Sequence, residues 1–383
     1  MPGGSEVKVI TSERVPIKIW AGDVEDGALS QAKDIANLPF AFKHVAIMPD
    51  THQGYGMPIG GVLATRGVVV PNAVGVDIGC GMRAVKTELQ EVGDIKSLMG
   101  KIREVVPLGF DHHKDDQGWE GFDNAPNEII VHQELGSARK QLGTLGGGNH
   151  FIEIEKGSDG FVWLMLHSGS RNFGYKIANH YHKEAQKLCE RWYSDVPNKD
   201  LAFLPIEEPE AKQYWTAMTY ALEFAKANRR AMMNRILEVW GCDVGEEAID
   251  IHHNYAAWEN HFNQNVIVHR KGATLARENT IGIIPGSQGT KSYIVRGKGN
   301  SESFNSCSHG AGRKMGRKEA SRNLNLEDEI KRLDDQGIIH GIRNVRDLDE
   351  AAGAYKDIGE VMKAQEDLVE ILVELQPLAV IKG

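Results

Sequence analysis

Short apolar runs in this chain stop at clusters of glycine and polar side chains, and this pattern limits the possible folds more than any other feature. Runs of this length are typical of buried β-strands, and a strand end is a fixed point from which a loop can present side chains. The runs expected as strands are His44–Met48, Gly61–Val70, Phe151–Glu155, Phe161–Leu166, Ile281–Pro285, Tyr293–Val295 and Leu378–Ile381. We therefore expect any chemistry to lie where these strands meet the glycine-rich turns.

Longer stretches with one apolar face and many charges predict helices. These stretches are Ser30–Asn37, Tyr175–Tyr193, Glu210–Trp240 and a last one at about 360–375. No repeat, low-complexity tract or Pro/Ser-rich linker divides the 383 residues. We therefore expect an α+β fold in which residues 1–383 form a single large domain of mixed β-sheets flanked by helices, with the functional site at the strand ends.

Composition and cysteine use limit the class of protein. Apolar residues make up 41% and charged residues 25% of the chain, which is the balance of a soluble protein with a substantial core. No stretch reaches the roughly 18 apolar residues of a membrane span, and the start MPGGSEVKVI lacks the features of a signal peptide. The four cysteines form no CxxC pair, so we expect reduced thiols, no membrane association and a cytoplasmic location.

The charge is unevenly distributed. The formal net charge of −9 argues against a surface that is basic throughout, as a general nucleic-acid coat would be. Between Lys291 and Arg322, however, eight Lys or Arg residues stand against two Glu residues. This segment fits a phosphate-bearing ligand, and it fits a solvated helix face equally well.

The first candidate for chemistry is the segment VGVDIGCG, in which Asp77 and Cys80 lie three residues apart among glycines. A turn can place both side chains on one side. A thiolate binds borderline metals and a carboxylate supplies a hard oxygen to the same or an adjacent ion. Taken alone, a buried structural cysteine explains the pattern better.

Three histidine positions follow the same design. His150 follows a run of three glycines and precedes an expected strand, His167 follows another expected strand, and the pair His252 and His253 lies in a third polar cluster. Adjacent side chains point apart in a helix or a strand, so we expect only one of the paired histidines to face a site. Each histidine alone fits a structural role, but together with the acid and the thiol they indicate a shared metal site.

The last cluster, SCSHGAGR, places His309 before two glycines and within the basic segment. A helix starting at about Arg313 would present Arg313 and Arg317 on one face. An imidazole nitrogen can attack a phosphate at neutral pH, and guanidinium groups stabilise the charge that develops on the phosphoryl oxygens. A helix N-terminal turn with a basic surface explains this segment equally well.

Common nucleotide-binding motifs are missing. The segment Pro285–Ser292 is not a Walker A motif, because Thr290 intervenes between Gly289 and Lys291. No GxGxxG fingerprint follows a strand, and no Lys-x-Asp-Gly signature is present. Any nucleotide must therefore be held in another way.

Read in order, ten blocks of the chain resemble those of the RtcB family of RNA-splicing ligases. They are MPDTHQGYGMPIGG, VGVDIGCG, LGTLGGGNHFIE, LHSGSRNFG, HHNYA, VHRKGAT, IIPGSQGTKS, SCSHGAGR, AYKDI and the terminal IKG. The resemblance extends from Pro16 to Gly383 and implies an RtcB-type fold.

The resemblance also implies a ligand set and a nucleophile. Two Mn²⁺ ions would share the thiolate of Cys80, with Asp77 and His150 on one ion and His167 and His253 on the other. The nucleophile that takes GMP from GTP would be His309. The implied GTP-binding residues are Asn149, Phe151, Ile152, Glu153, Asn254, Pro285, Gly286, Ser287, Gln288, Ser292, Gly310, Ala311, Gly312 and Lys382, of which Glu153 and Lys382 would select guanine.

The reaction implied by the resemblance joins an RNA 3′-phosphate or 2′,3′-cyclic phosphate end to a 5′-hydroxyl end. The cyclic phosphate opens to a 3′-phosphate, GMP passes from His309 to that phosphate, and the 5′-hydroxyl displaces GMP. Such a ligase serves RNA repair or tRNA splicing, in some members with an archease-type activator. The candidate RNA contacts are Asp50, His52, Arg171, Arg313 and Arg317.

Three positions depart from the usual family pattern, namely Gln288 in place of Met, Thr51 in place of Val and Gly316 in place of Ser. They leave open the finer fit of GTP and RNA. Two other readings remain: a metal-dependent phosphodiesterase that opens cyclic phosphates without ligation, and a non-enzymatic RNA-binding subunit. His309 and its nucleotide pocket distinguish the ligase from the phosphodiesterase.

Overall fold

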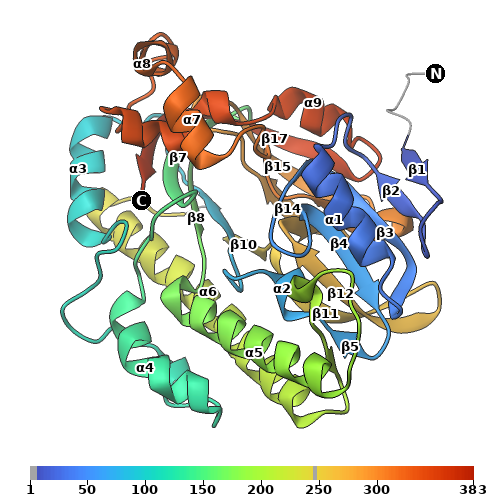
Figure 1. Cartoon of the computed structure of the whole chain (residues 1–383). Helices are drawn as coiled ribbons and strands as arrows, with labels where there is room; N and C mark the ends of the chain where they lie inside the picture. Colours follow the sequence, from blue (N-terminus) through green and yellow to red (C-terminus); the bar gives the residue numbers. More distant parts are fainter. Residues whose placement is uncertain (1–6, 245–247) are drawn as a thin grey trace.

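Two large β-sheets with helices packed around them build the molecule (Figure 1). The structure is a computed structural model that describes residues 7–244 and 248–383. The expectation about an N-terminal signal falls partly on residues 1–6, which lie outside this described part. The mixed sheets and flanking helices confirm the α+β class. Whether residues 1–383 form one domain stays a prediction.

The first sheet has six strands and the second has seven. In spatial order the first contains β1 (Lys8–Ile10), β2 (Ile17–Ile19), β3 (Ala41–His52), β4 (Ile59–Thr65), β12 (Gln264–Lys271) and β11 (Asn254–His261). The second contains β10 (Ile249–His252), β6 (Gly81–Lys86), β8 (Val162–Ser168), β7 (Phe151–Gly157), β17 (Val369–Lys382), β15 (Ser292–Gly297) and β14 (Ile281–Ile284). Strands β2 and β3 pair in parallel, and the other pairs within these two sheets are antiparallel.

Two small ladders and several helices complete the fold. The ladders pair β13 (Ala273–Leu275) with β16 (Ser306–Ser308), and β5 (Val68–Val69) with β9 (Leu204–Pro205). The α-helices are α1 (Asp26–Ala36), α2 (Pro71–Val74), α3 (Ile95–Val105), α4 (Ile129–Gln141), α5 (Arg171–Arg191), α6 (Pro209–Trp240), α7 (Arg317–Asn323), α8 (Leu326–Asp334) and α9 (Ile358–Lys363). Short 3₁₀ helices lie at Glu120–Phe122, Lys199–Leu201, Ser301–Ser303, Val345–Glu350 and Ala352–Ala354.

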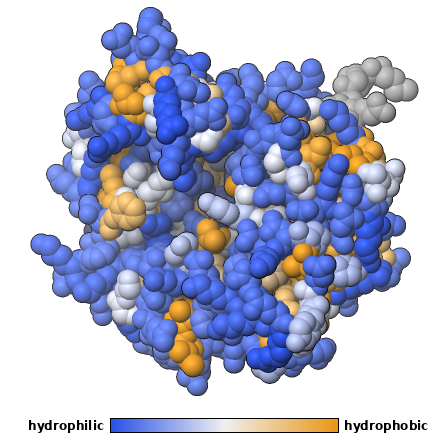
Figure 2. Space-filling view, in the orientation of Figure 1, coloured by the Kyte–Doolittle hydropathy of each residue, from blue (hydrophilic) through white to orange (hydrophobic). Residues whose placement is uncertain are grey.

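The long helices follow from their sequence. Helix α6 has a proline at its first turn and ends at Gly241, whose φ of 73° is the left-handed conformation that favours glycine. Helix α5 buries Phe173, Ile177, Tyr181 and Leu188 on one face, spaced as a helix requires. The two helices lie side by side, and α6 also packs on β6 and β8 of the seven-stranded sheet (Figure 1). Hydrophilic residues cover most of the face in Figure 2.

Most expected elements are present, and three expectations were wrong in detail. The helix expected at about 360–375 is the six-residue α9 followed by strand β17, which pairs with both β15 and β7. Long-range pairing outweighs the local helical pattern there. The run Gly61–Val70 is divided between β4 and β5. The helix expected from about Arg313 begins only at Arg317, after Gly316 as N-cap.

Candidate active site

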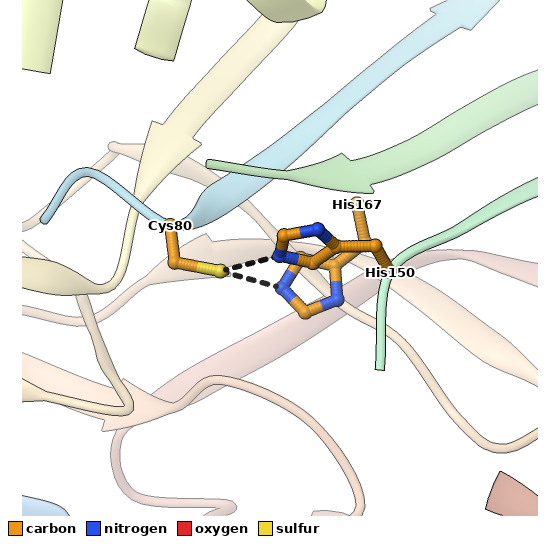
Figure 3. A group of neighbouring side chains, drawn as sticks. All are labelled: Cys80, His150 and His167. Atoms are coloured by element: carbon orange, nitrogen blue, oxygen red, sulfur yellow. Dashed lines mark hydrogen bonds between the residues drawn. The ribbon is translucent and has the colours of Figure 1, made fainter. Parts of the chain in front are cut away.

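Three residues far apart in the sequence meet where strands of the seven-stranded sheet begin or end. Cys80 directly precedes β6, His150 directly precedes β7, and His167 lies near the end of β8. The Cys80 Sγ atom is 3.5 Å from His150 Nε2 and 3.2 Å from His167 Nε2. Both imidazole rings turn a nitrogen toward this sulfur (Figure 3). All three side chains are buried. These donor atoms lie close enough together to hold one metal ion.

The other two predicted ligands lie against this group. His253 Nε2 is 3.2 Å from His167 Nε2, and an Asp77 carboxylate oxygen is 3.1 Å from His150 Nε2. His252 points elsewhere, with Nδ1 3.1 Å from the carbonyl oxygen of Gly79. Only one histidine of the pair therefore faces the cluster, as the alternation of side chains predicts.

Backbone carbonyls set the tautomers of two histidines. His150 Nδ1 lies 2.9 Å from the Leu145 carbonyl oxygen, and His167 Nδ1 lies 3.1 Å from that of Asn149. Because a carbonyl only accepts, the His167 Nδ1 carries the proton and its Nε2 turns a lone pair toward Cys80. At His150 the carbonyl contact of 2.9 Å is shorter than the contact of 3.2 Å with an Arg171 N–H, and it favours the same tautomer. Burial, and then neighbouring positive groups, hold the pKa of His167 well below its usual range. The imidazole is therefore neutral, as a metal ligand must be.

The donor set fits a metal ion. Burial, and then the Asp77 charge, raise the pKa of the Cys80 thiol well above its usual value. A bound cation would reverse this balance because it stabilises the thiolate. Asp77 Oδ1 and His253 Nδ1 are buried without a hydrogen-bond partner among the described residues. A carboxylate, a thiol and imidazole lone pairs that converge in this way have one thiol proton among several acceptors, and a shared cation would satisfy them all.

His309 follows β16 and is held by Asp50 of β3. Its Nδ1 lies 2.5 Å from an Asp50 carboxylate oxygen, which also accepts from the His309 backbone N–H at 3.1 Å. Burial alone raises the pKa of Asp50, but the charge and hydrogen bond of His309 outweigh it and lower that pKa. Asp50 is thus ionised and accepts the Nδ1 proton, so that in the neutral form of the His309 ring the lone pair lies on Nε2. The His309 ring centroid is 4.8 Å from that of His253. His309, although distant in the sequence, therefore lies next to the Cys/His cluster.

The predicted guanine-selecting residues lie on neighbouring strands. Phe151 pairs with Lys382, and Glu153 pairs with Val380, in the β7–β17 ladder. The Lys382 Nζ atom is 5.4 Å from the centroid of the Phe151 ring. Burial, and then the Glu155 charge, raise the pKa of Glu153 well above its usual value, against the opposing charge of Lys382.

The other predicted nucleotide residues form two groups. One group lies around the segment after β14 and contains Pro285, Gly286, Ser287, Gln288, Ser292 and Gly310. Ser292 Oγ accepts from Gly286 N at 3.2 Å, and a Cβ on Gly310 would lie 3.3 Å from the Pro285 carbonyl oxygen. Asn254 donates to the Asp77 carbonyl and accepts from Gly272 N, beside His309. Asn149 contributes its carbonyl to His167. The side chains of Ile152 and Ala311 instead pack in hydrophobic clusters.

Gly312, three residues after His309, occupies a position that only glycine fits. Its φ of 73° is left-handed, and a Cβ there would lie 2.1 Å from the Asp50 carbonyl oxygen. Any side chain would therefore displace the strand that carries Asp50. The close approach of Gly312 to β3 keeps Asp50 under His309.

The candidate RNA-contacting residues differ in solvent exposure and in their partners. Asp50 is 0% exposed and His52 is half-buried. Arg171 donates to Thr144 Oγ1 at 3.3 Å and lies 3.2 Å from His150 Nδ1. Arg313 and Arg317 do not share a helix face, yet both bind the buried carboxylate of Glu350, at 2.9 and 2.6 Å.

Sequence reasoning missed two groups that hold the site together. Asn228 and Arg229 of α6 are both fully buried. Arg229 donates to the carbonyls of Gly79 and Ser168, and Asn228 bonds Gly143, Thr144 and Gly169. Two polar residues within the otherwise apolar face of α6 were the sequence signal that could have identified them. Glu350, which binds Arg313, Arg317 and the Tyr355 hydroxyl, carried no comparable signal.

The fold and the site define a class of protein, namely a mixed α+β protein with a buried Cys/His centre suited to a metal ion, next to a histidine oriented by an aspartate. The family model described as tRNA-splicing ligase RtcB matches residues 31–125 and 117–383. The chain belongs to the RtcB family. Among the described residues, no helix has the length and apolar character needed to cross a membrane.

Similar proteins extend over nearly the whole chain. The RNA-splicing ligase RtcB of Escherichia coli strain K12 is 38% identical over 98% of this chain and 99% of its own length. The tRNA-splicing ligase RtcB of Nanoarchaeum equitans is 33% identical over 96% of this chain and 95% of its own. The RNA-splicing ligase RtcB of Mycobacterium tuberculosis strain H37Rv is 30% identical over 92% of this chain and 100% of its own.

Proposed function

We propose that this protein is a GTP-dependent RNA ligase that joins an RNA 3′-phosphate or 2′,3′-cyclic phosphate end to a 5′-hydroxyl end, in RNA repair or tRNA splicing. The observation that carries the proposal is the position of His309, whose Nδ1 proton is held by Asp50 and whose ring lies against His253 of the Cys/His cluster. Membership in the RtcB family supports an RNA ligase. The end chemistry and GTP follow from the family resemblance.

In this proposal two Mn²⁺ ions would be held by Asp77, Cys80, His150, His167 and His253. The donor set suits a divalent transition metal, and the choice of Mn²⁺ follows the resemblance. When bound, the ions would supply Lewis acidity to phosphate oxygens. The carbonyls of Leu145 and Asn149 fix the ring orientations through the Nδ1 protons.

The first step is the transfer of GMP to His309. The Nε2 lone pair attacks the α-phosphorus of GTP, an N–P bond forms, the bond from that phosphorus to the bridging oxygen breaks, and pyrophosphate leaves. The ring gains positive character in this step, and the Asp50 carboxylate stabilises it through the Nδ1 proton. Because Asp50 is buried and already paired with His309, we assign it this orienting role in preference to an RNA contact.

Glu153 and Lys382 select guanine in this proposal. They lie close together on neighbouring strands, and Lys382 also lies near the Phe151 ring. A carboxyl and an ammonium offer acceptor and donor groups to the base edge. Arg171, Arg313, Arg317 and His52 remain the proposed contacts to RNA phosphates, and an archease-type activator remains a possible partner by resemblance alone.

The test is covalent labelling. The protein is incubated with GTP labelled in the α-phosphate and with Mn²⁺, and the acid-labile label on the protein is measured. We expect label on the wild type, none on His309→Ala, and a normal amount on His132→Ala, an exposed histidine of α4. Absence of label from metal-loaded wild type, together with opening of a 2′,3′-cyclic phosphate, would identify a phosphodiesterase instead.

A further inference from the structure

Phe110 is an aromatic side chain that the fold leaves entirely in solvent. Its exposure is 104%, the highest among the large apolar residues of the described chain. A phenyl ring offers roughly 150–250 Å² of surface, and none of it is used here to stabilise the fold. The ring is therefore available to a ligand.

The backbone around Phe110 is fixed although its ring is free. Gly109 N donates to the Gly146 carbonyl at 3.2 Å, Leu108 forms a bridge with Gly146, and Asp111 N donates to the Leu108 carbonyl at 3.0 Å. Leu145 N also donates to the Pro107 carbonyl at 3.0 Å. Because hydrogen bonds flank Phe110 on both sides, binding to its ring costs little ordering of the chain.

These anchors place Phe110 at the rim of the candidate active site. The partner segment, residues 145–149, leads directly to His150 and supplies the carbonyls that orient the cluster histidines. A Cβ on Gly147 would lie 3.8 Å from Gly109 Cα, and one on Gly148 would lie 2.9 Å from Arg317 Nη2. The glycine loop thus lies between the segment that contains Phe110 and the half-exposed side chain of Arg317.

Two further arginines lie toward β17, the strand that leads to Gly383, whose backbone N–H donates to the His150 carbonyl at 3.3 Å. Helix α3, which ends five residues before Phe110, packs against β17 (Figure 1). A Cβ on Gly341 would lie 3.9 Å from Arg103 Nη2, and Ile339 hydrogen-bonds with Leu378 and Val380 of β17. Burial, and then the charge of Arg343, lower the pKa of Arg103. Two like charges held near each other form a place for an anion such as a phosphate.

We propose that Phe110 is a stacking platform for one unpaired nucleobase of the RNA strand that leads into the site, and that Arg103 and Arg343 bind a phosphate of the same strand. An exposed aromatic ring on one side of the glycine loop, with Arg317 on the other side of that loop, is a local device of the kind that single-stranded nucleic acid requires. The inference rests on the proposed function, because it takes RNA as the substrate of this site. Phe110 is a positioning residue in this account and touches no reacting atom.

The test measures binding of a short, fluorescently labelled single-stranded RNA with a 3′-phosphate to the full protein. Phe110→Ala should weaken binding roughly ten-fold, and Phe110→Trp should retain it. Arg103→Ala combined with Arg343→Ala should weaken binding and reduce its dependence on salt. The matched control is Tyr193→Ala, which removes a 95% exposed ring beyond the far end of α5, about 30 Å from Arg171 at the start of that helix.

A set of RNAs that each lack one base separates stacking from a general structural effect. The loss caused by Phe110→Ala should disappear for the RNA that lacks the stacked base and persist for the others. If Phe110→Ala and the wild type bind the RNA equally well, the proposal is overturned. This is the result expected if Phe110 contacts a protein partner instead of RNA. A loss that is the same for every RNA in the set overturns the proposal as well.

Labelling of His309 with GMP needs no RNA, so it separates the two proposals. Normal labelling of wild type and Phe110→Ala, with unchanged RNA binding, would leave the ligase proposal intact and refute stacking. Absence of label from wild type, with a stacking loss at one position, would refute the ligase chemistry and support stacking. Because Phe110 makes no core contact, the variants are expected to fold normally.

Discussion

A single buried carboxylate sets the chemical state of His309. Asp50 accepts both the backbone N–H and the Nδ1 proton of that residue, so the same group fixes the ring orientation and the tautomer. Its second oxygen has no hydrogen-bond partner among the described residues. The hydrogen bonds that the Asp50 carboxylate accepts from described residues therefore come from His309, and the low dielectric of the protein interior strengthens their interaction.

Asp50→Asn should slow the labelling of His309 by GTP about 100-fold or more, because a neutral amide stabilises the positive ring less and can stabilise the wrong tautomer. The measurement is the single-turnover rate of label incorporation. Asp334→Asn serves as the control, since Asp334, the last residue of α8, lies 3.3 Å from His340 in an Asp–His pair whose carboxylate is exposed. An unchanged rate in Asp50→Asn would show that the carboxylate does not act on His309.

Cys80→Ala should abolish high-affinity metal binding, because it removes the sulfur from the centre of the cluster and leaves imidazoles without the shared ligand. Metal content after dialysis against Mn²⁺ is the measurement. Cys189→Ala removes another buried thiol, on α5, and should retain the metal. Retention of metal by Cys80→Ala would contradict a bridging role.

At the scale of elements, the sequence predicts strands well where a run is buried by its immediate neighbours. Strand β8 is buried along its whole length and was expected from its apolar run. The first half of β17 was taken for a helix, although Leu378–Ile381 in its second half was expected as a strand. The charged residues at 370 and 374 mimic helical spacing, and only the partners β15 and β7 reveal a strand there. Local periodicity cannot encode pairing with strands more than 70 residues away.

The same limit applies to the site. The histidines and Cys80 could be singled out because they lie beside glycines at strand ends. Their mutual distances depend on Asn228 and Arg229, which join three loops from the middle of α6. Side chains that act on distant backbone carbonyls leave no spacing motif, so pattern reasoning could not assign them.

Arg229→Met should destabilise the protein by roughly 3–5 kcal/mol, because Asp250 keeps its ion pair with Arg83 but loses the one with Arg229, and the Gly79 and Ser168 carbonyls lose their donor. The affinity for Mn²⁺ should fall as well, since those carbonyls adjoin Cys80 and His167. Thermal unfolding and metal titration measure both. Arg230→Met, at the exposed neighbouring position, should change neither; equal behaviour of the two variants would argue against this role.

At the scale of the whole molecule, the site belongs to both sheets. Cys80, His150 and His167 are supplied by the seven-stranded sheet, whereas Asp50 lies on the six-stranded one. His253 is the one residue between β10 of the seven-stranded sheet and β11 of the six-stranded sheet. The distance between His309 and the cluster therefore depends on how the two sheets are held together.

A buried ion pair ties the β11–β12 hairpin to the segment that carries His309. Arg270 of β12 binds Glu259 of β11 at 2.5 Å, and it also donates to Ser306 Oγ and to the Phe304 carbonyl. Residue 306 begins β16, which ends one residue before His309. The hairpin thus sets the position of His309 through Arg270.

Glu259 predicts how the stability of the molecule depends on pH. Burial alone raises its pKa, but the charge of Arg270 and the hydrogen bonds of His261 and Arg270 outweigh burial and bring the pKa to about 2. A carboxyl with a lowered pKa stabilises the fold above its unfolded value of about 4.5 and loses that contribution as pH falls toward 2, roughly 3 kcal/mol in all. Glu259→Gln should therefore be less stable than wild type at pH 7, with the difference narrowing steadily below pH 4.5. Urea unfolding across this range measures it, with the exposed Glu327→Gln of α8 as control; a difference that stays constant with pH would show that Glu259 does not carry its charge in the folded state.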